Sequence, residues 1–256
     1  MERVRHGLGL GDRSNMAILS EEKGNGSNRN GMTLVELLIA ALISGIVMSA
    51  VYAVYRSQQR SYNRETTVAA MQQNARVALY NLERELRMAG CDPTGKAGAG
   101  FMVADSATVQ FTMDFEGGIT DLKDNDDDGT IDESDEEFFA DGTASGDRED
   151  VVYVLSDKGS DGDLDLTRNG DLVAENIDAL NFVYFDQNSA VLTAPVDTTR
   201  IRAVQITLVA RTDTIDPDLN NTTVYRNRQN DIIYTANDSF RRILLSTIIK
   251  TRNMGI

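Results

Sequence analysis

The spacing of hydrophobic residues divides the chain into an apolar segment, a periodic segment and a β-like remainder. Residues 32–55 are almost wholly apolar and carry a single charge, at Glu36, so this segment is long enough to span a bilayer as a helix. Hydrophobic residues then recur mostly every three or four positions as far as Leu86, which predicts one apolar stripe on a helix. Proline is absent from residues 32–89. We therefore predict one continuous helix over residues 32–89, with its first half in the membrane.

Beyond residue 100 the pattern changes toward that of β-strands. Strands are predicted at residues 107–113, 150–155, 179–185, 201–211 and 242–252. Apolar and polar side chains alternate clearly in the last two, and one face of 201–211 should pack on the helix. Asn169-Gly170 separates two short alternating runs, which predicts a hairpin with a type I′ turn. The predicted fold class is α+β, with a sheet in a β-rich head, residues 90–256, packed against the long helix.

Composition and charge exclude several function classes. The net charge is −15, and residues 1–31 contain five Lys/Arg and four Asp/Glu, so the rest of the chain carries −16. Nucleic acid is therefore not an expected partner. The only histidine, His6, lies in the polar N-terminal segment and Cys91 is the only cysteine, which excludes thiol–histidine and multi-histidine zinc chemistry. A membrane-anchored hydrolase using two carboxylates would lack the rest of its site, so we predict that the protein is not an enzyme.

The charge inside the apolar segment is the most informative residue of the chain. A carboxylate in hydrocarbon costs about 2.5–3.5 kcal/mol on insertion scales, so it needs a partner or a function; alternatively, Glu36 reaches the headgroups from the helix end. Residues 31–40, Gly-Met-Thr-Leu-Val-Glu-Leu-Leu-Ile-Ala, resemble the processing motif of type IV prepilins. The resemblance implies cleavage after Gly31 by a prepilin peptidase and N-methylation of Met32, where the family usually has phenylalanine. It also implies that Glu36 pairs with the N-terminus of a neighbouring subunit.

The same resemblance makes residues 1–31 a leader peptide. A leader of this length is long for the family, and a start at Met16 would shorten it while keeping Lys23 and Arg29 before the cut. We therefore expect translation to begin at Met16. Three arginines soon after the apolar segment balance these two, so the positive-inside rule does not decide the orientation. An extracytoplasmic head follows from the resemblance alone.

Two further stretches, residues 71–93 and 240–253, resemble PilW-type minor pilins. The resemblance implies a type IV pilin-like subunit of the inner membrane whose periplasmic head later reaches the pilus at the cell surface. Its partners would be the prepilin peptidase and other pilins, contacted through the N-terminal helix. A J-type pseudopilin of type II secretion shares the motif, the long helix and a β-rich head, and is the first alternative. The second is a membrane-anchored, calcium-dependent adhesin or sensor.

The richest local chemistry lies in residues 124–135, Asp-Asn-Asp-Asp-Asp-Gly-Thr-Ile-Asp-Glu-Ser-Asp, which match an EF-hand-type loop through its first nine positions. The candidate calcium ligands are Asp124, Asp126, Asp128, the backbone carbonyl of Thr130, Asp132 and Asp135. A bidentate glutamate is expected where Asp135 stands, and Glu136 comes one position late. Without a convincing helix on either side, we predict a lone calcium loop between strands. The alternative is a solvated acidic loop.

Two smaller features complete the candidate chemistry. A second acidic group, spaced along residues 157–165, fits no ligand template, and its carboxylates are expected to be exposed. Cys91 cannot form an intrachain disulfide. We expect it to be buried at the junction of helix and sheet; the alternative is a thiol that pairs with another subunit.

Overall fold

The computed structural model describes residues 31–126 and 128–255. The predicted leader and the predicted start at Met16 lie outside the described residues, except for Gly31. The chain divides into two compact units, Met1–Val54 and Tyr55–Ile256. Within these residues, one α-helix and a β-rich region form most of the regular structure, which confirms the predicted α+β class.

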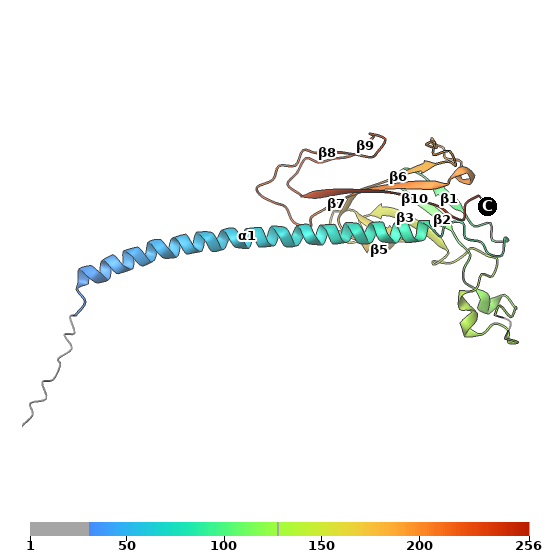
Figure 1. Ribbon diagram of the computed structural model, residues 1–256, viewed down its shortest axis with the longest axis horizontal. Helices are drawn as coiled ribbons and strands as arrows, with labels where there is room; N and C mark the ends of the chain where they lie inside the picture. Colours follow the sequence, from blue (N-terminus) through green and yellow to red (C-terminus); the bar gives the residue numbers. More distant parts are fainter. Residues whose placement is uncertain (1–30, 127, 256) are drawn as a thin grey trace, which may run out of the picture. The chain divides into compact units, whose positions relative to one another are not determined.

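A single α-helix, α1, runs from Leu34 to Leu86, compared with the predicted 32–89 (Figure 1). Turn residues follow it as far as Gly90. Its N-terminal part has a mean hydropathy of 2.4 over 18 residues and, by length and composition, could cross a membrane. None of that window is buried within the chain, so its apolar side chains are left for a lipid or protein environment.

In the described part of the chain, the strands form three antiparallel sheets in place of the single sheet predicted. The five-stranded sheet follows chain order: β1 (Phe101–Ala104), β2 (Val109–Thr112), β3 (Asp150–Ser156), β4 (Asp165–Arg168) and β5 (Asp171–Ala174). The three-stranded sheet has β7 (Ala203–Arg211) between β6 (Ile177–Phe185) and β10 (Arg242–Lys250). A hairpin joins β8 (Val224–Arg226) and β9 (Ile232–Thr235). Three short 3₁₀ helices complete the list: η1 (Gly118–Thr120), η2 (Ser134–Phe138) and η3 (Thr198–Arg200).

The five predicted strands overlap β2, β3, β6, β7 and β10, and the predicted hairpin is formed by β4 and β5. Its turn residues, Asn169 and Gly170, both have positive φ, +51° and +83°, as a type I′ turn requires. The Asn169 side chain also accepts a hydrogen bond from Val152 N at 2.7 Å and donates one to the Asp150 carbonyl at 2.8 Å. The asparagine therefore shapes the turn and ties it to β3.

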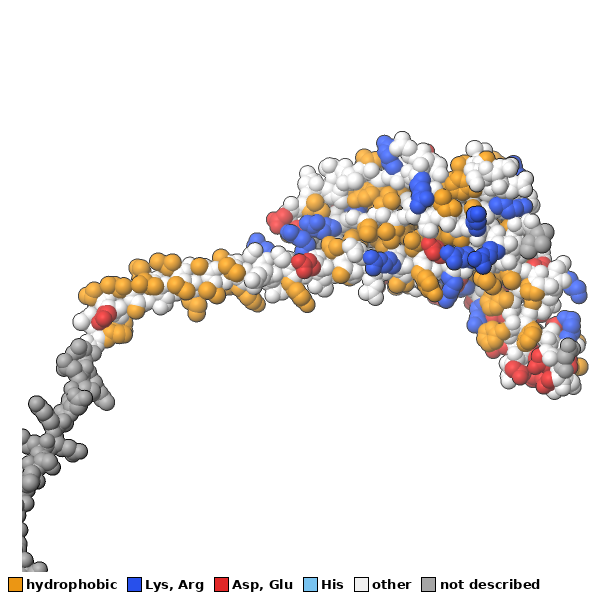
Figure 2. All heavy atoms as spheres, viewed as in Figure 1, with side chains coloured by type: hydrophobic (Ala, Val, Ile, Leu, Met, Phe, Trp, Pro, Cys, Tyr) orange, Lys and Arg blue, Asp and Glu red, His pale blue; other side chains and the backbone are white. Residues whose placement is uncertain are grey.

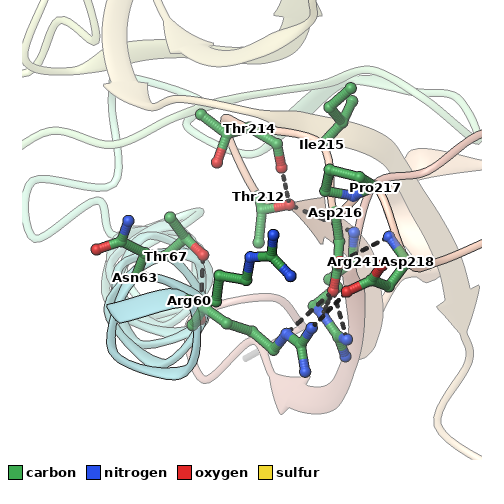
Figure 3. A pocket seen from close by; sticks show the side chains of 11 residues that line it. Arg60, Asn63, Thr67, Thr212, Thr214, Ile215, Asp216, Pro217, Asp218 and Arg241 are labelled. Atoms are coloured by element: carbon green, nitrogen blue, oxygen red, sulfur yellow. Dashed lines mark hydrogen bonds and ion pairs between the residues drawn. The ribbon is translucent and has the colours of Figure 1, made fainter. Parts of the chain in front are cut away.

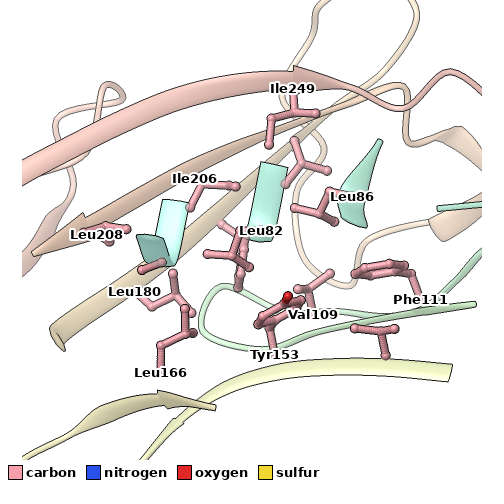
Figure 4. Packing of buried hydrophobic residues seen from close by; sticks show 14 of the residues in the cluster. Leu82, Leu86, Val109, Phe111, Tyr153, Leu166, Leu180, Ile206, Leu208 and Ile249 are labelled. Carbon is pink, nitrogen blue, oxygen red and sulfur yellow. The ribbon is translucent and has the colours of Figure 1, made fainter. Parts of the chain in front are cut away.

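The predicted stripe of α1 is the buried face of the helix. Its fully or nearly fully buried residues are Met71, Ala75, Ala78, Leu82 and Leu86. Figure 4 shows Leu82 and Leu86 among side chains from both larger sheets, including Tyr153 of β3 and Ile206 of β7. The core therefore forms where the second half of α1 meets both sheets.

A polar network fastens the same half of α1 to the five-stranded sheet. Glu85 pairs with Nε of Arg168 on β4 at 2.9 Å and accepts a hydrogen bond from the Tyr153 hydroxyl, also at 2.9 Å. Tyr153 is fully buried, so its hydroxyl needs this partner. Arg168 also donates to the Asp147 carbonyl at 2.8 Å, which links the helix, β4 and the loop before β3.

The central strand β7 is buried on both faces, whereas its alternating sequence identified only one buried face. Val204, Ile206 and Leu208 belong to the core cluster with α1. The opposite face carries Gln205, which is fully buried and exchanges hydrogen bonds with Gln229 at 2.8 and 3.3 Å. Gln229 lies between β8 and β9, so that hairpin covers the polar face and satisfies its buried amide.

Candidate functional sites

The residues of the predicted processing motif lie at the exposed start of α1. The Thr33 hydroxyl accepts a hydrogen bond from Glu36 N at 3.2 Å, and the Glu36 carboxylate accepts one from Thr33 N at 3.4 Å. This reciprocal pair is a capping box, which satisfies two N–H groups at the helix start. The Thr-x-x-Glu spacing of residues 33–36 is its sequence signal, and Thr33 was not among the predicted site residues.

The capping box fixes the Glu36 carboxylate close to the predicted cut. A negative charge in the first turn is stabilised by the helix dipole. Met32 precedes Thr33 directly, so cleavage after Gly31 would create a positive amine one residue from a hydrogen-bond partner of Glu36. After cleavage, the motif would therefore carry the Glu36 carboxylate and the Met32 amine at the same helix end. In an apolar environment, two such opposite charges can offset each other's desolvation cost.

The helix surface that follows is apolar and exposed. Large side chains such as Leu34 and Met48 are 75% and 70% exposed, and Figure 2 shows hydrophobic side chains along the N-terminal part of α1. A contiguous apolar surface of this kind marks a membrane or protein interaction site.

The acidic loop brings three of its predicted ligands together. Asp124, Asp126 and Asp128 each place one carboxylate oxygen within 4.8 Å of the other two. The Asp128 N–H donates to both Asp124 and Asp126 at 3.1 Å, and Gly129 N donates to Asp124 at 2.8 Å. Gly129 has φ +99°, a left-handed conformation that suits glycine where the loop turns sharply.

The structure places the other predicted ligands outside this group of three. Thr130 N donates to Asp128 at 2.8 Å, so Thr130 lies next to the cluster. The Asp132 carboxylate accepts a hydrogen bond from Leu122 N at 2.9 Å, which directs it to the other limb of the loop. Asp135 is exposed on η2. Among the described residues, only Asp124, Asp126 and Asp128 form such an acidic group.

Two glutamates that the template did not include hold the loop closed. Glu136 is fully buried and accepts hydrogen bonds from Asn125 N and, at 3.2 Å, from Glu133 N. Glu133 in turn caps the Glu136 N–H, which forms the capping box of η2. The second carboxylate oxygen of Glu133 is buried and has no hydrogen-bond partner among the described residues. Glu136, which comes one position after the expected calcium ligand, therefore stabilises the loop from its inside.

Electrostatics in the loop follow from this crowding. Desolvation, together with the charges of Asp128 and Glu136, raises the pKa of Glu133 to about 7. The pKa of Asp126 is also raised, because desolvation and the carboxylates of Asp124, Asp128 and Asp135 outweigh the hydrogen bond from the Asp128 N–H. Uncompensated negative charge therefore collects at this loop, and a bound cation would relieve it.

The second acidic group meets the expectation of exposure at Asp157 and Asp161 but differs from it at Asp163 and Asp165. Asp165 is 4% exposed, not solvated, and accepts a hydrogen bond from Asn176 N at 3.1 Å. Asp163 pairs with Arg211 at 2.8 Å. These two carboxylates therefore serve the packing of β4 and β7.

Cys91 lies where the turn after α1 meets β2. It is half-buried and packs against the core cluster. Its carbonyl accepts a hydrogen bond from Asp114 N at 2.7 Å. Burial, with help from the charges of Asp114 and Asp92, raises the pKa of its thiol, which keeps it protonated and unreactive.

Comparison with known proteins adds one match that bears on function. A family model described as the prokaryotic N-terminal methylation motif matches residues 26–52. Comparison with curated proteins gives no match. Among solved structures, a type IV-like pilin from Thermus thermophilus is similar, with a TM-score of 0.42 and 14% identity over 72% of this chain and 98% of that chain. The motif match makes the N-terminus prepilin-like.

Proposed function

We propose that this protein is a PilW-like minor pilin, a subunit of a type IV pilus that is cleaved after Gly31 and N-methylated on Met32. The match to the methylation motif at residues 26–52 carries the proposal. The exposed apolar part of α1 supports it, because this surface suits the inner membrane before assembly and neighbouring pilin helices afterwards. In this proposal the head is periplasmic first and lies on the pilus at the cell surface later.

In the same proposal Glu36 acts as the assembly residue. When the apolar part of α1 leaves the bilayer for a bundle of apolar helices, the Glu36 carboxylate stays in a low dielectric. A cation such as a methylated amine can offset the cost of keeping this charge out of water. The capping box supports this role, because its hydrogen bond from Thr33 N would stabilise the carboxylate of a free subunit until a partner arrives.

Replacement of Glu36 tests this role. We expect Glu36→Ala to be cleaved and to enter the membrane fraction but to be lost from sheared pili. Glu65→Ala is the matched control, since Glu65 is an exposed carboxylate of α1 beyond the predicted span, and it should enter pili normally. Unchanged incorporation of Glu36→Ala would contradict an assembly role. Loss of protein secretion with normal piliation, in a strain lacking the protein, would instead favour the J-type pseudopilin alternative.

We further propose that the acidic loop binds calcium through Asp124, Asp126 and Asp128. The clustering of their three oxygens within 4.8 Å supports this, and hard oxygen ligands suit calcium. Because Asp132 and Asp135 lie outside the group, water would complete the coordination. The expected affinity is that of extracellular modules, a Kd of about 10⁻⁴–10⁻³ M.

Calorimetric titration of the full chain in detergent micelles tests calcium binding. The double variant Asp126→Ala/Asp128→Ala should abolish the heat of binding. Asp157→Ala/Asp161→Ala, which removes as many carboxylates from another exposed loop, should leave it intact. Absence of binding heat at millimolar calcium, or an equal loss of that heat in both double variants, would contradict calcium binding and indicate a solvated acidic loop.

A further inference from the structure

A cavity of about 310 Å³ lies between α1 and the loop that follows β7. Arg60, Asn63 and Thr67 line it from the helix, and Thr214 and Asp216 line it from the loop (Figure 3). All of these residues lie in the C-terminal unit. Neither the core nor the N-terminal motif uses this cavity.

The charges around the cavity leave one cation uncompensated. Asp216 pairs with Arg64 at 3.2 Å and with Arg241 at 2.6 Å, and Asp218 pairs with Arg64 at 3.4 Å. The two aspartates are thus matched by two arginines. Arg60, in contrast, has no hydrogen-bond or ion-pair partner in the described part of the chain.

The neutral groups beside Arg60 favour an acceptor ligand. The side-chain carbonyl of Asn63 accepts a hydrogen bond from Gln59 at 3.0 Å, which leaves the Asn63 NH₂ group to donate. The guanidinium of Arg60 adds five N–H donors from the same helix. Oxyanions, and phosphate above all, are the groups that such donors bind most strongly.

The position of Arg60 indicates where that oxyanion comes from. Arg60 is five residues beyond Tyr55, the last residue of the predicted span, which is about 7.5 Å along an α-helix. The headgroup layer on each side of the hydrocarbon core is about 5–8 Å thick. Ile215, which also lines the cavity, is 58% exposed, so an apolar side chain is available beside the cation.

We propose that this cavity binds the phosphate of a membrane phospholipid headgroup, with Arg60 as its charged ligand. The proposal rests on the membrane anchoring proposed above. It gives the subunit a lipid contact at the junction of membrane and head, separate from the assembly role of Glu36.

Native mass spectrometry of the full chain, released from detergent micelles, tests the site. One probe is phosphatidylglycerol and the other is diacylglycerol with the same acyl chains but no phosphate. The wild-type chain should retain one phosphatidylglycerol and no diacylglycerol. Loss of a charge-assisted hydrogen bond should weaken retention about tenfold in Arg60→Gln. Arg60 has no partner to lose, so its replacement should leave the circular dichroism spectrum unchanged.

Arg56→Gln is the matched control, because Arg56 lies one turn nearer the membrane but does not line the cavity. Its lipid retention should stay within about twofold of wild type. Equal losses in both variants would show general attraction of basic side chains to lipid and overturn the site. Retention of diacylglycerol equal to that of phosphatidylglycerol would overturn the lipid site as well. Unchanged retention of phosphatidylglycerol by Arg60→Gln would also overturn it. If, in that case, Arg60→Gln were lost from pili, the ligand of Arg60 would be a carboxylate of another subunit.

Inorganic phosphate, the third probe, separates the two sources of the ligand. Competition by phosphate against bound phosphatidylglycerol would support headgroup binding, whereas phosphate binding without lipid retention would identify an ion site and overturn the lipid proposal. Cell fractionation tests membrane anchoring separately from lipid binding at the cavity. A chain absent from the membrane fraction would contradict the proposed anchoring, while the micelle measurement still reports on the cavity.

Discussion

Replacing Glu85 would show how strongly α1 is held to the head by polar contacts. Glu85→Ala removes the acceptor of the Tyr153 hydroxyl and of Arg168 Nε, each at 2.9 Å. Tyr153 is fully buried, so its hydroxyl would lose the one hydrogen-bond partner it has among the described residues, at a cost of about 1–3 kcal/mol. Arg168 keeps its bond to the Asp147 carbonyl and its side chain is 24% exposed, so water relieves part of its loss. We expect the free energy of unfolding to fall by about 2–4 kcal/mol.

Urea unfolding of the full chain in micelles, followed by the circular dichroism of the β-sheets, measures this change. Glu83→Ala is the matched control, because Glu83 lies on the same helix and, among the described residues, its side chain forms only a surface pair with Arg87 at 3.6 Å. This variant should cost less than about 0.5 kcal/mol. Adding Tyr153→Phe to Glu85→Ala should recover part of the loss, since no buried hydroxyl then remains unpaired. Equal small effects of Glu83→Ala and Glu85→Ala would refute the reasoning.

Further variants test the core, the hairpin, the buried ion pair and the loop beside the cavity. Leu82→Ala should lower the free energy of unfolding by about 2–5 kcal/mol in the same assay, because Leu82 is fully buried. Gly170→Ala should cost about 1 kcal/mol through its positive φ alone, since a Cβ there meets no atom within 4 Å. Asp178→Asn should cost about 2–3 kcal/mol, because Asp178 pairs at 2.5 Å with Arg242, whose side chain is fully buried. The hydrogen bond from Arg241 holds the pKa of Asp216 below its ordinary value of 3.8. The stabilisation that ionised Asp216 gives the folded state is complete above pH 3.8 and is lost as the pH falls through the lowered pKa. Amide exchange in residues 212–218 should therefore accelerate only in that acidic range.

The sequence predicted best those features that depend on local spacing. The stripe containing Leu82 and Leu86 follows from the helical period, and the β4–β5 turn follows from the positive φ that Asn169 and Gly170 tolerate. In contrast, β1 and β8 are only four and three residues long, too short to show an alternation. The burial of Gln205 was not predictable, because its cover comes from Gln229 in a hairpin more than twenty residues later.

The candidate site shows the same limit. The spacing of Asp124, Asp126 and Asp128 predicted a cluster because one turn of loop brings them together. The direction of Glu136 depends on η2, which folds it inward to Asn125 N, and an acidic run carries no signal for that. Thr33 was a different case: its Thr-x-x-Glu signature was present in the sequence and was not used. Arg60 became informative only when the structure showed that its neighbours were already paired.

Processing and assembly as a prepilin are the steps on which the proposed function depends. Mass spectrometry of the N-terminal peptide of the protein, purified from the membrane and from sheared pili of its own cells, tests these steps most directly. We expect a chain that begins at Met32 and carries one added methyl group on its amine. An intact leader, or a cut at any other bond, would contradict it.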